Sequence, residues 1–399
     1  MIVMEIKKIS EKLDCLVVFR GILEDPIVIL WQKMLKRIIN GEDAAPVYSS
    51  FLAKLYEQGG DFGEYLLTLV MNSENIFVKK ETHRKNPLIV SCLNNELELL
   101  DRISSMSPSS IITFIESMSP YSVPLPGYTS TPKNFKSLYA LKIDKLPTQG
   151  YGMFAKHRMF TFNEGGLSPV LNPDPQSLSS LVGYEEERKP LIANTLSLLE
   201  GNFAGNALLY GDAGTGKSAT IKALVNEYND QGLRLIEIKK KNLHLLSDLM
   251  NELKENPLKF ILFVDDLTFP NQDENFSALK SALEGGASTQ NRNTVIYATS
   301  NRRHLLKEIM SDRRGEVLHE NDTIQETMGL AARFGLTITY QRPDRDLYYK
   351  IVKDYANEYG LLLEEKALLT KAEAYAIRNG GRSPRAAKQF VQLEKGLSD

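Results

Sequence analysis

The alternation of apolar and polar positions divides the chain into a helical part followed by a part in which strands and helices alternate. In the first part, Asp25 and Asn86 each precede a proline that opens an apolar helical run. A capping side chain followed by proline is typical of a helix start. Three leucines downstream repeat at helical spacing, which predicts a face packed in a core: Leu93, Leu97 and Leu100.

In the second part, short apolar runs alternate with stretches of helix length. The runs cover residues 206–211, 233–239, 260–266, 294–301 and 336–340. Strands that alternate with helices indicate parallel βαβ units, and therefore a sheet covered by helices on both faces. We expect an α/β fold here, followed by a purely helical C-terminal segment.

A stretch rich in proline, glycine and serine separates the two parts, with a strand-like patch at 151–162 inside it. Such composition is typical of a connector with a small irregular or hairpin element. The expected organisation therefore has four segments. They are an N-terminal helical domain (1–118), a connector (119–180), an α/β core (181–342) and a C-terminal helical lid (343–399).

Composition narrows the class of protein without naming a partner. The 399 residues are 42% apolar and 25% charged, as in an ordinary globular protein. A formal net charge of -2 argues against wholesale attraction to nucleic acid or to an anionic membrane. Cys15 and Cys92 are too few for a disulfide framework, and the five histidines are scattered, so we expect no transition-metal site.

Targeting signals are not evident at the start of the chain. Its first residues carry charges too early for a secretory signal, and the apolar stretch at 25–35 is too short and too interrupted to span a bilayer. We expect a cytoplasmic protein without membrane insertion.

A glycine-rich turn lies between the apolar run 206–211 and a helical pattern. Gly211, Gly216, Lys217 and Ser218 fit the spacing G-x-x-x-x-G-K-[ST] of a phosphate-binding loop. Glycines let backbone N–H groups turn towards phosphate, and the helix N-terminus adds partial positive charge. Lys217 would reach the β- and γ-phosphates of ATP, and the Ser218 hydroxyl would bind Mg²⁺. The alternative is an ordinary turn at a helix start.

The residues expected to bind the nucleotide at this turn are consecutive: Gly211, Asp212, Ala213, Gly214, Thr215, Gly216, Lys217, Ser218 and Ala219.

Two later apolar runs each end in polar residues. Asp265 would hold Mg²⁺ directly or through water, and Asp266 would polarise the attacking water. A helix N-cap with a neighbouring aspartate is the alternative for this pair. Hydrolytic ATPases of this kind insert a strand beside the phosphate-loop strand, and a polar residue at its end touches the γ-phosphate or the water. Asn301 occupies that place.

These motifs resemble the AAA+ ATPases over roughly 181–399. Gly211 to Ser218 match Walker A, Asp265 and Asp266 match Walker B, and Asn301 matches sensor 1. The resemblance implies an AAA+ P-loop core with a C-terminal helical lid, which binds ATP and Mg²⁺.

Further sequence segments support the resemblance. Gly183 and Tyr184 lie in a segment similar to the one that contacts adenine. Several stretches together resemble the bacterial AAA+ family known as domain of unknown function 815, over most of the chain: LYGDAGTGKS, FILFVDDL, LKSALEGG, YATSNRRHL and RFGLTITY. No substrate is established for this family.

Two arginines complete the candidate site. The resemblance places an arginine finger at Arg333 and sensor 2 at Arg385. Ser383 caps a helix that a proline opens, and Arg385 projects from its first turn, where a cation opposes the helix dipole and suggests a nearby anion. A surface ion pair is the alternative for Arg333, and Arg313 and Arg314 are second candidates for the finger.

Two departures from the family pattern affect the mechanism. Most AAA+ proteins have Asp-Glu at Walker B, so Asp266 is one methylene shorter and slow turnover is expected. The region after the second apolar run lacks the aromatic residue of threading members and instead carries Lys239, Lys240 and Lys241. These lysines face either a nucleic-acid backbone or solvent.

The sequence thus predicts a AAA+ ATPase that self-associates into a ring or an open oligomer. It would hydrolyse ATP to drive or time the remodelling of an unidentified protein or nucleic-acid partner. The second hypothesis is a nucleotide switch or scaffold with negligible hydrolysis. A small-molecule P-loop kinase ranks last, because the chain has no evident acceptor pocket or arginine-bearing lid of the kinase type.

Overall fold

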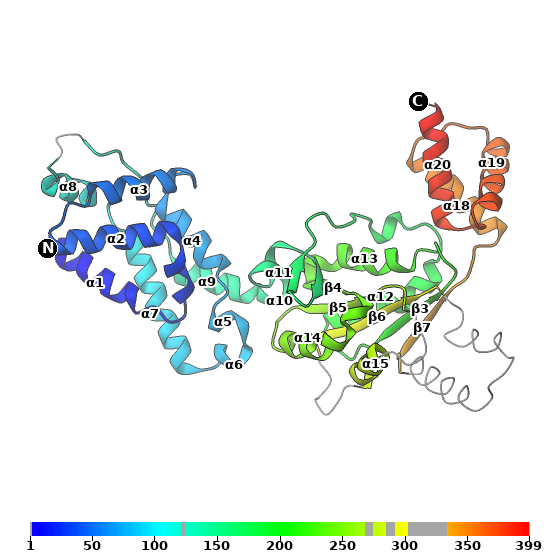
Figure 1. The fold of residues 1–399 in the computed structure, drawn as a ribbon, viewed down its shortest axis with the longest axis horizontal. Helices are drawn as coiled ribbons and strands as arrows, with labels where there is room; N and C mark the ends of the chain where they lie inside the picture. The colour runs from blue at the N-terminus through cyan, green and yellow to red at the C-terminus, as the bar shows by residue number, and fades with distance from the viewer. Residues whose placement is uncertain (1, 121–123, 268–273, 285–291, 302–332, 399) are drawn as a thin grey trace. The chain divides into compact units, whose positions relative to one another are not determined.

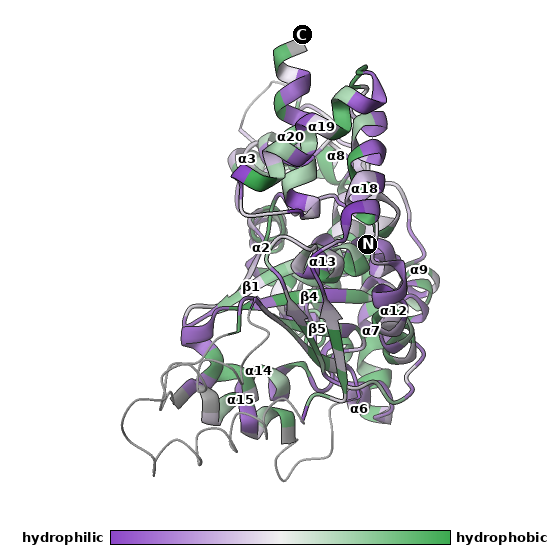
Figure 2. Ribbon diagram, turned by 90° about the vertical axis from the view of Figure 1, so that its right-hand side faces the viewer, coloured by the Kyte–Doolittle hydropathy of each residue, from purple (hydrophilic) through white to green (hydrophobic). Residues whose placement is uncertain are grey.

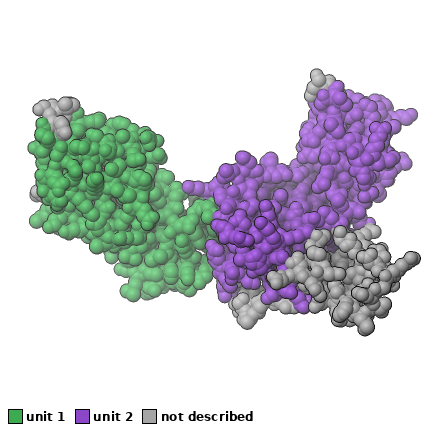
Figure 3. Space-filling model, viewed as in Figure 1, with its two compact units in different colours: residues 1–155, 255–257 green, residues 156–254, 258–399 purple. Residues whose placement is uncertain are grey.

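The chain folds into two compact units, which Figure 3 colours separately. The computed structural model describes residues 2–120, 124–267, 274–284, 292–301 and 333–398. The first unit comprises Met1–Ala155 with Glu255–Pro257, and the second comprises Lys156–Lys254 with Leu258–Asp399.

The first unit is helical, as its apolar pattern predicts. Its elements are α1 (Ile2–Asp14), η1 (Arg20–Glu24), α2 (Pro26–Asn40), α3 (Ala45–Tyr56), α4 (Phe62–Asn72), α5 (Ile76–Lys79), α6 (Glu81–Arg84), α7 (Pro87–Ser104), α8 (Pro108–Met118), α9 (Phe135–Asp144), α10 (Leu146–Gln149) and α11 (Met153–Lys156). Both expected helix starts are confirmed. Asp25 accepts hydrogen bonds from the amides of Ile27 and Val28, and Asn86 accepts one from Leu88.

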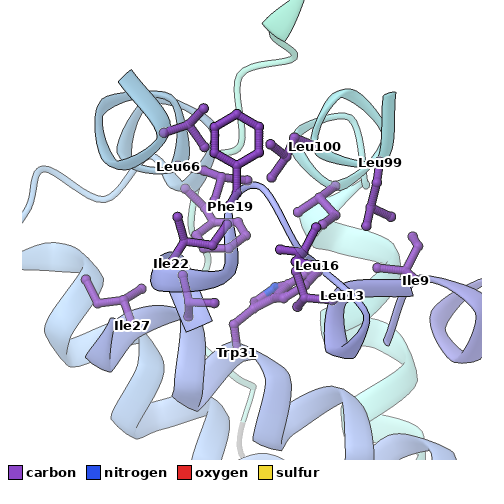
Figure 4. Close-up of a cluster of buried hydrophobic side chains, with 14 of the residues drawn as sticks. Ile9, Leu13, Leu16, Phe19, Ile22, Ile27, Trp31, Leu66, Leu99 and Leu100 are labelled. Carbon is purple, nitrogen blue, oxygen red and sulfur yellow. The ribbon is translucent and has the colours of Figure 1, made fainter. Parts of the chain in front are cut away.

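A hydrophobic core built from several of these helices holds the first unit together (Figure 4). Trp31, the only tryptophan of the chain, is 1% exposed within it. The predicted leucine stripe on α7 is buried, which confirms its packing role: Leu93, Leu97 and Leu100.

A buried carboxylate ties α7 to the loop after α1. Glu96 accepts hydrogen bonds from the backbone amides of Val17, Val18 and Phe19, at 2.7, 3.0 and 2.9 Å. These amides lie between α1 and η1, where no helical carbonyl can satisfy them, so Glu96 supplies the acceptor that burial requires.

The proline-rich segment is more ordered than a connector. Phe135 and Tyr139 of α9 are buried in the core of the first unit, so residues up to 155 belong to that unit. Apolar burial of these aromatic rings outweighs the flexibility that composition alone suggests. Only the end of the strand-like patch is a strand: β1 (Met159–Asn163) forms a hairpin with β2 (Gly166–Pro169), whereas Met153–Lys156 form the short helix α11.

The second unit contains a seven-stranded sheet in the order β2-β1-β4-β5-β6-β3-β7. The remaining strands are β3 (Ala207–Gly211), β4 (Leu233–Ile238), β5 (Lys259–Val264), β6 (Thr294–Ser300) and β7 (Leu336–Tyr340). Only the β1–β2 pair of the described strands is antiparallel. All five apolar runs expected as strands are confirmed.

Helices cover both faces of this sheet, as expected for parallel strands. Figure 1 shows α12 (Glu185–Leu199) and α13 (Lys217–Tyr228) on one face, with α14 (Leu246–Leu253) and α15 (Glu274–Glu284) on the other. Short turns of 3₁₀-helix lie before α12, after α13 and before α14: η2 (Leu178–Ser180), η3 (Asn229–Gln231) and η4 (Lys240–Leu245).

Three helices form the C-terminal lid: α18 (Arg345–Glu358), α19 (Glu365–Arg378) and α20 (Pro384–Ser398). Each carries hydrophobic and hydrophilic positions (Figure 2), and the hydrophobic ones form a separate small core. Within the described residues, no helix is both long and apolar enough to cross a membrane.

The strand order decides which loops meet. Strand β6 lies between β3 and β5 and is parallel to both. The carboxyl ends of parallel strands share one edge of a sheet, so the residues that follow Gly211, Val264 and Ser300 are neighbours. This arrangement confirms the inserted strand that the order of motifs predicts.

Candidate functional site

The turn after β3 has a backbone that only glycine adopts easily. Gly211 has a φ of 136°, and a Cβ atom there would overlap the carbonyl of Tyr340 on β7. Gly216, with a φ of 95°, directly precedes α13. The loop therefore folds tightly between strand and helix, and the first amides of α13 point into it.

Lys217 is the first residue of α13 and is 5% exposed. Its Nζ donates to the carbonyl oxygens of Gly211 at 3.1 Å and Asp212 at 2.7 Å. Burial lowers the pKa of the Lys217 ammonium, whereas the carboxylates of Asp212 and Asp265 oppose that shift. A buried cation satisfied only by carbonyl oxygens is poised to pair with an anion that enters the loop.

An acidic pair lies beside the loop. Asp265 and Asp266 directly follow β5, and Asp265 Oδ1 accepts a hydrogen bond of 2.7 Å from Ser218 Oγ on α13. Asn301, just beyond β6, donates through Nδ2 to Asp266 Oδ1 at 3.0 Å. The structure thus brings together four residues that the sequence places up to 83 positions apart, from Ser218 to Asn301.

One residue of this cluster was missed by the sequence reasoning. Thr299 is 2% exposed, and its hydroxyl donates to Asp265 Oδ1 at 2.5 Å and accepts from the Asp266 amide at 3.0 Å. The available signal was its spacing, because Thr299 lies two positions before Asn301 and alternate strand residues share a face.

The lid contacts the phosphate loop through the start of α20. Ser383 Oγ accepts the Ala386 amide at 3.1 Å, which confirms the expected helix cap. The Arg385 amide donates to the Gly214 carbonyl at 3.2 Å. A Cβ atom on Gly214 would lie 3.2 Å from the Cβ of Arg385. The exposed Arg385 side chain therefore begins directly beside the loop.

The segment expected near adenine lies at the junction of core and lid. Tyr184 is buried, stacks on Tyr340 with ring centroids 5.3 Å apart, and donates its hydroxyl to the Gln341 carbonyl at 2.6 Å. The adjacent Gly183 has a φ of 75°. Arg188, which the sequence reasoning missed, donates to the carbonyls of Leu181, at 2.8 Å, and of Gly183.

Arg333 lies at the end of the sheet where the parallel strands begin, opposite the end that carries the phosphate loop. It precedes β7, whose first residue Leu336 pairs with Ala207 at the start of β3, while Tyr340 pairs with Gly211 at the loop. Strand β7 alone spans roughly 13 Å, so the Arg333 side chain does not reach the phosphate loop of its own chain. The second candidates for the finger, at 313 and 314, lie outside the described residues.

The lysine run follows β4. Lys239 and Lys241 are exposed and Lys240 is partly buried at the start of η4.

Among the described residues, no group of three or more histidine, cysteine or acidic side chains could hold a metal ion by itself.

The strand order β4-β5-β6-β3-β7, the loop between β3 and α13, and the helical lid define a AAA+ P-loop fold. Within this class, the chain belongs to the family described as protein of unknown function DUF815, whose model matches residues 154–397. The resemblance stated from the motifs is therefore confirmed.

Solved structures of two bacterial proteins are similar to the chain. A variant of RuvB from Thermotoga maritima is 18% identical, over 55% of this chain and 63% of that one, with a TM-score of 0.38. AMPPCP-bound DnaA from Aquifex aeolicus is 18% identical, over 56% and 66%, with a TM-score of 0.39. In both comparisons, less than two thirds of the solved chain is covered. No curated protein matches the sequence.

Proposed function

We propose that the protein binds ATP with Mg²⁺ and hydrolyses it. The observation that carries this proposal is the contact between the phosphate loop and the acidic pair, made by the hydrogen bond from Ser218 Oγ to Asp265 Oδ1. A buried lysine, a hydroxyl and two carboxylates then surround the space in which the terminal phosphates of a nucleotide would lie.

The residues fit a magnesium ion. Ser218 and Asp265 present a hydroxyl and a carboxylate oxygen, the hard ligands that Mg²⁺ prefers, and they already meet beside the loop. Mg²⁺ in such sites is held by one or two protein groups together with phosphate oxygens and water. When bound, the ion would neutralise charge on the β- and γ-phosphates.

Asp266 is the base that we assign to the attacking water. The water oxygen would attack the γ-phosphorus, the bond to the β-phosphate oxygen would break, and the water proton would pass to Asp266. Asn301 holds the Asp266 side chain, and Lys217 would pair with the phosphates. Arg385 approaches the same loop from the lid and would sense the γ-phosphate, while Gly183 and Tyr184 would border the base.

The place of Arg333 favours an assembly of several chains. Because this arginine lies at the edge of the sheet opposite its own phosphate loop, it would act on nucleotide only if a neighbouring chain presents its loop there. We therefore propose self-association into a ring or an open oligomer, with hydrolysis coupled to the remodelling of a protein or nucleic-acid partner.

A nucleotide switch with negligible hydrolysis is the second candidate. Asp266 favours this candidate, because the side chain of aspartate is one methylene shorter than that of glutamate and holds its carboxylate farther from the attacking water. The rate of phosphate release by the unmodified chain separates the two candidates.

Lys217→Ala is expected to abolish ATP binding without unfolding the chain, because the substitution removes a cation whose partners are loop carbonyls. ATP with Mg²⁺ should raise the melting temperature of the parent protein but not that of the variant. Lys222→Ala, on the same helix, is the control and should respond like the parent. Equal melting shifts for the parent and Lys217→Ala would contradict the assigned role.

Asp266→Asn is expected to bind ATP as the parent does and to hydrolyse it at least about tenfold more slowly. Asparagine keeps the shape of the side chain and tolerates the left-handed backbone of this residue, whose φ is 51°, but it cannot accept the proton. Asp248→Asn, an exposed position on α14, serves as the control in a phosphate-release assay. Unchanged turnover in Asp266→Asn would assign the base elsewhere.

Arg333→Ala is expected to keep ATP binding and to lose hydrolysis, since fingers of this kind contribute about 10³ to 10⁵ in rate. Mixing it with Lys217→Ala should restore part of the activity, because an intact loop then meets an intact finger. Arg378→Ala, an exposed arginine at the end of α19, is the control for loss of charge. An inactive mixture of subunits that demonstrably co-assemble would exclude action between chains.

A further inference from the structure

Thr299, the penultimate residue of β6, holds both members of the acidic pair. The buried Thr299 hydroxyl donates to Asp265 Oδ1 at 2.5 Å and accepts the Asp266 amide at 3.0 Å. The Thr299 carbonyl accepts the Leu267 amide at 2.6 Å. One threonine therefore binds three successive residues of the neighbouring turn, two of them through a single hydroxyl group.

The Asp265 carboxylate is held mainly through one oxygen. Oδ1 accepts from Ser218 Oγ at 2.7 Å, from Thr299 Oγ1 at 2.5 Å and from the Asp266 amide at 3.1 Å. Rotation of this carboxylate would break all three bonds, so its plane is fixed relative to Ser218. Magnesium demands near-ideal octahedral geometry, so the direction of a ligand oxygen matters as much as its presence.

The backbone of Asp266 needs support of its own. Its φ of 51° lies in the left-handed region, which is uncommon for residues other than glycine and best tolerated by asparagine and aspartate. Thr299 binds its amide, and Asn301 binds its side chain at 3.0 Å. Thr299 on β6 and Asn301 just beyond that strand thus fix where the proposed base points.

We propose that Thr299 is a positioning residue for the magnesium and water-activating groups of this site. Its hydroxyl, rather than its bulk, sets the orientation of Asp265 and supports the turn at Asp266. This inference rests on the proposed function, because it concerns how that site holds Mg²⁺ with ATP. Outer partners of metal ligands typically change metal affinity or activity by about 10- to 100-fold when they are removed.

The test compares two substitutions that separate the hydroxyl from the bulk of the side chain. Thr299→Val keeps the shape and removes both hydroxyl hydrogen bonds, whereas Thr299→Ser keeps the hydroxyl. The same strand provides a matched control in Thr294→Val, because Thr294 Oγ1 is buried and has no hydrogen-bond partner among the described residues. Melting temperatures establish that each variant is folded, and Thr299→Ala replaces Thr299→Val if valine does not fit.

The readout is the affinity for a fluorescent ATP analogue, measured in EDTA and across a magnesium titration. Thr299→Val should bind the analogue in EDTA as the parent does, but should need about tenfold more Mg²⁺ to reach the tighter state, with hydrolysis slowed by about tenfold or more. Thr299→Ser and Thr294→Val should follow the parent in both measurements.

Three results would overturn the inference. A magnesium titration of Thr299→Val that matches the parent would make Thr299 an ordinary core residue. Equal impairment of the valine and serine variants would assign the effect to packing. If the parent does not bind the analogue at all, the proposed function is refuted, and the inference with it. If the parent binds normally and Thr299→Val is unaffected, only the inference is refuted.

Discussion

The parallel pairing of β3, β6 and β5 is the constraint on which the candidate site depends. Tyr210 pairs with Ser300, and Ala298 pairs with Val264, so the three strands end at one edge in register. A slip of one residue in either pair would turn Thr299 to the opposite face of the sheet. The hydrogen bonds among the loop, the acidic pair and β6 exist because this register holds.

The same loop is also connected to the lid at two places. Asp212 Oδ2 accepts the Arg342 amide at 2.8 Å, at the point where β7 leads into α18, and Gly214 accepts the Arg385 amide at the start of α20. Tyr184 donates to the adjoining Gln341 carbonyl. Hydrogen bonds therefore join the loop both to the segment that leads into the lid and to the start of its last helix.

The sequence predicted most of the fold, because each element has a strong local signal. Strands β3 to β7 are predominantly apolar runs, and Asp25 and Asn86 cap helices that proline opens. The segment 119–180 was harder, since prolines and glycines indicate a connector while the burial of Phe135 and Tyr139 depends on partners distant in sequence.

In the candidate site, residues with a motif were predictable and residues that support them were not. Lys217, Ser218 and the aspartates have fixed spacings, and the structure places them together. Thr299 and Arg188 act through hydrogen bonds to carbonyl, amide and carboxylate groups that only the folded chain brings near. No spacing in the sequence indicates the contacts of Arg188, and Thr299 is marked only by its place two positions before Asn301.

We propose that this loop and this acidic pair form one site for ATP with Mg²⁺. Isothermal titration calorimetry of the unmodified chain tests this proposal, with ATP titrated in the presence of Mg²⁺ and again in EDTA. We expect saturable binding with one nucleotide per chain, and a clear loss of affinity when the metal is removed. Absence of saturable binding in both titrations, with a folded protein, would contradict it.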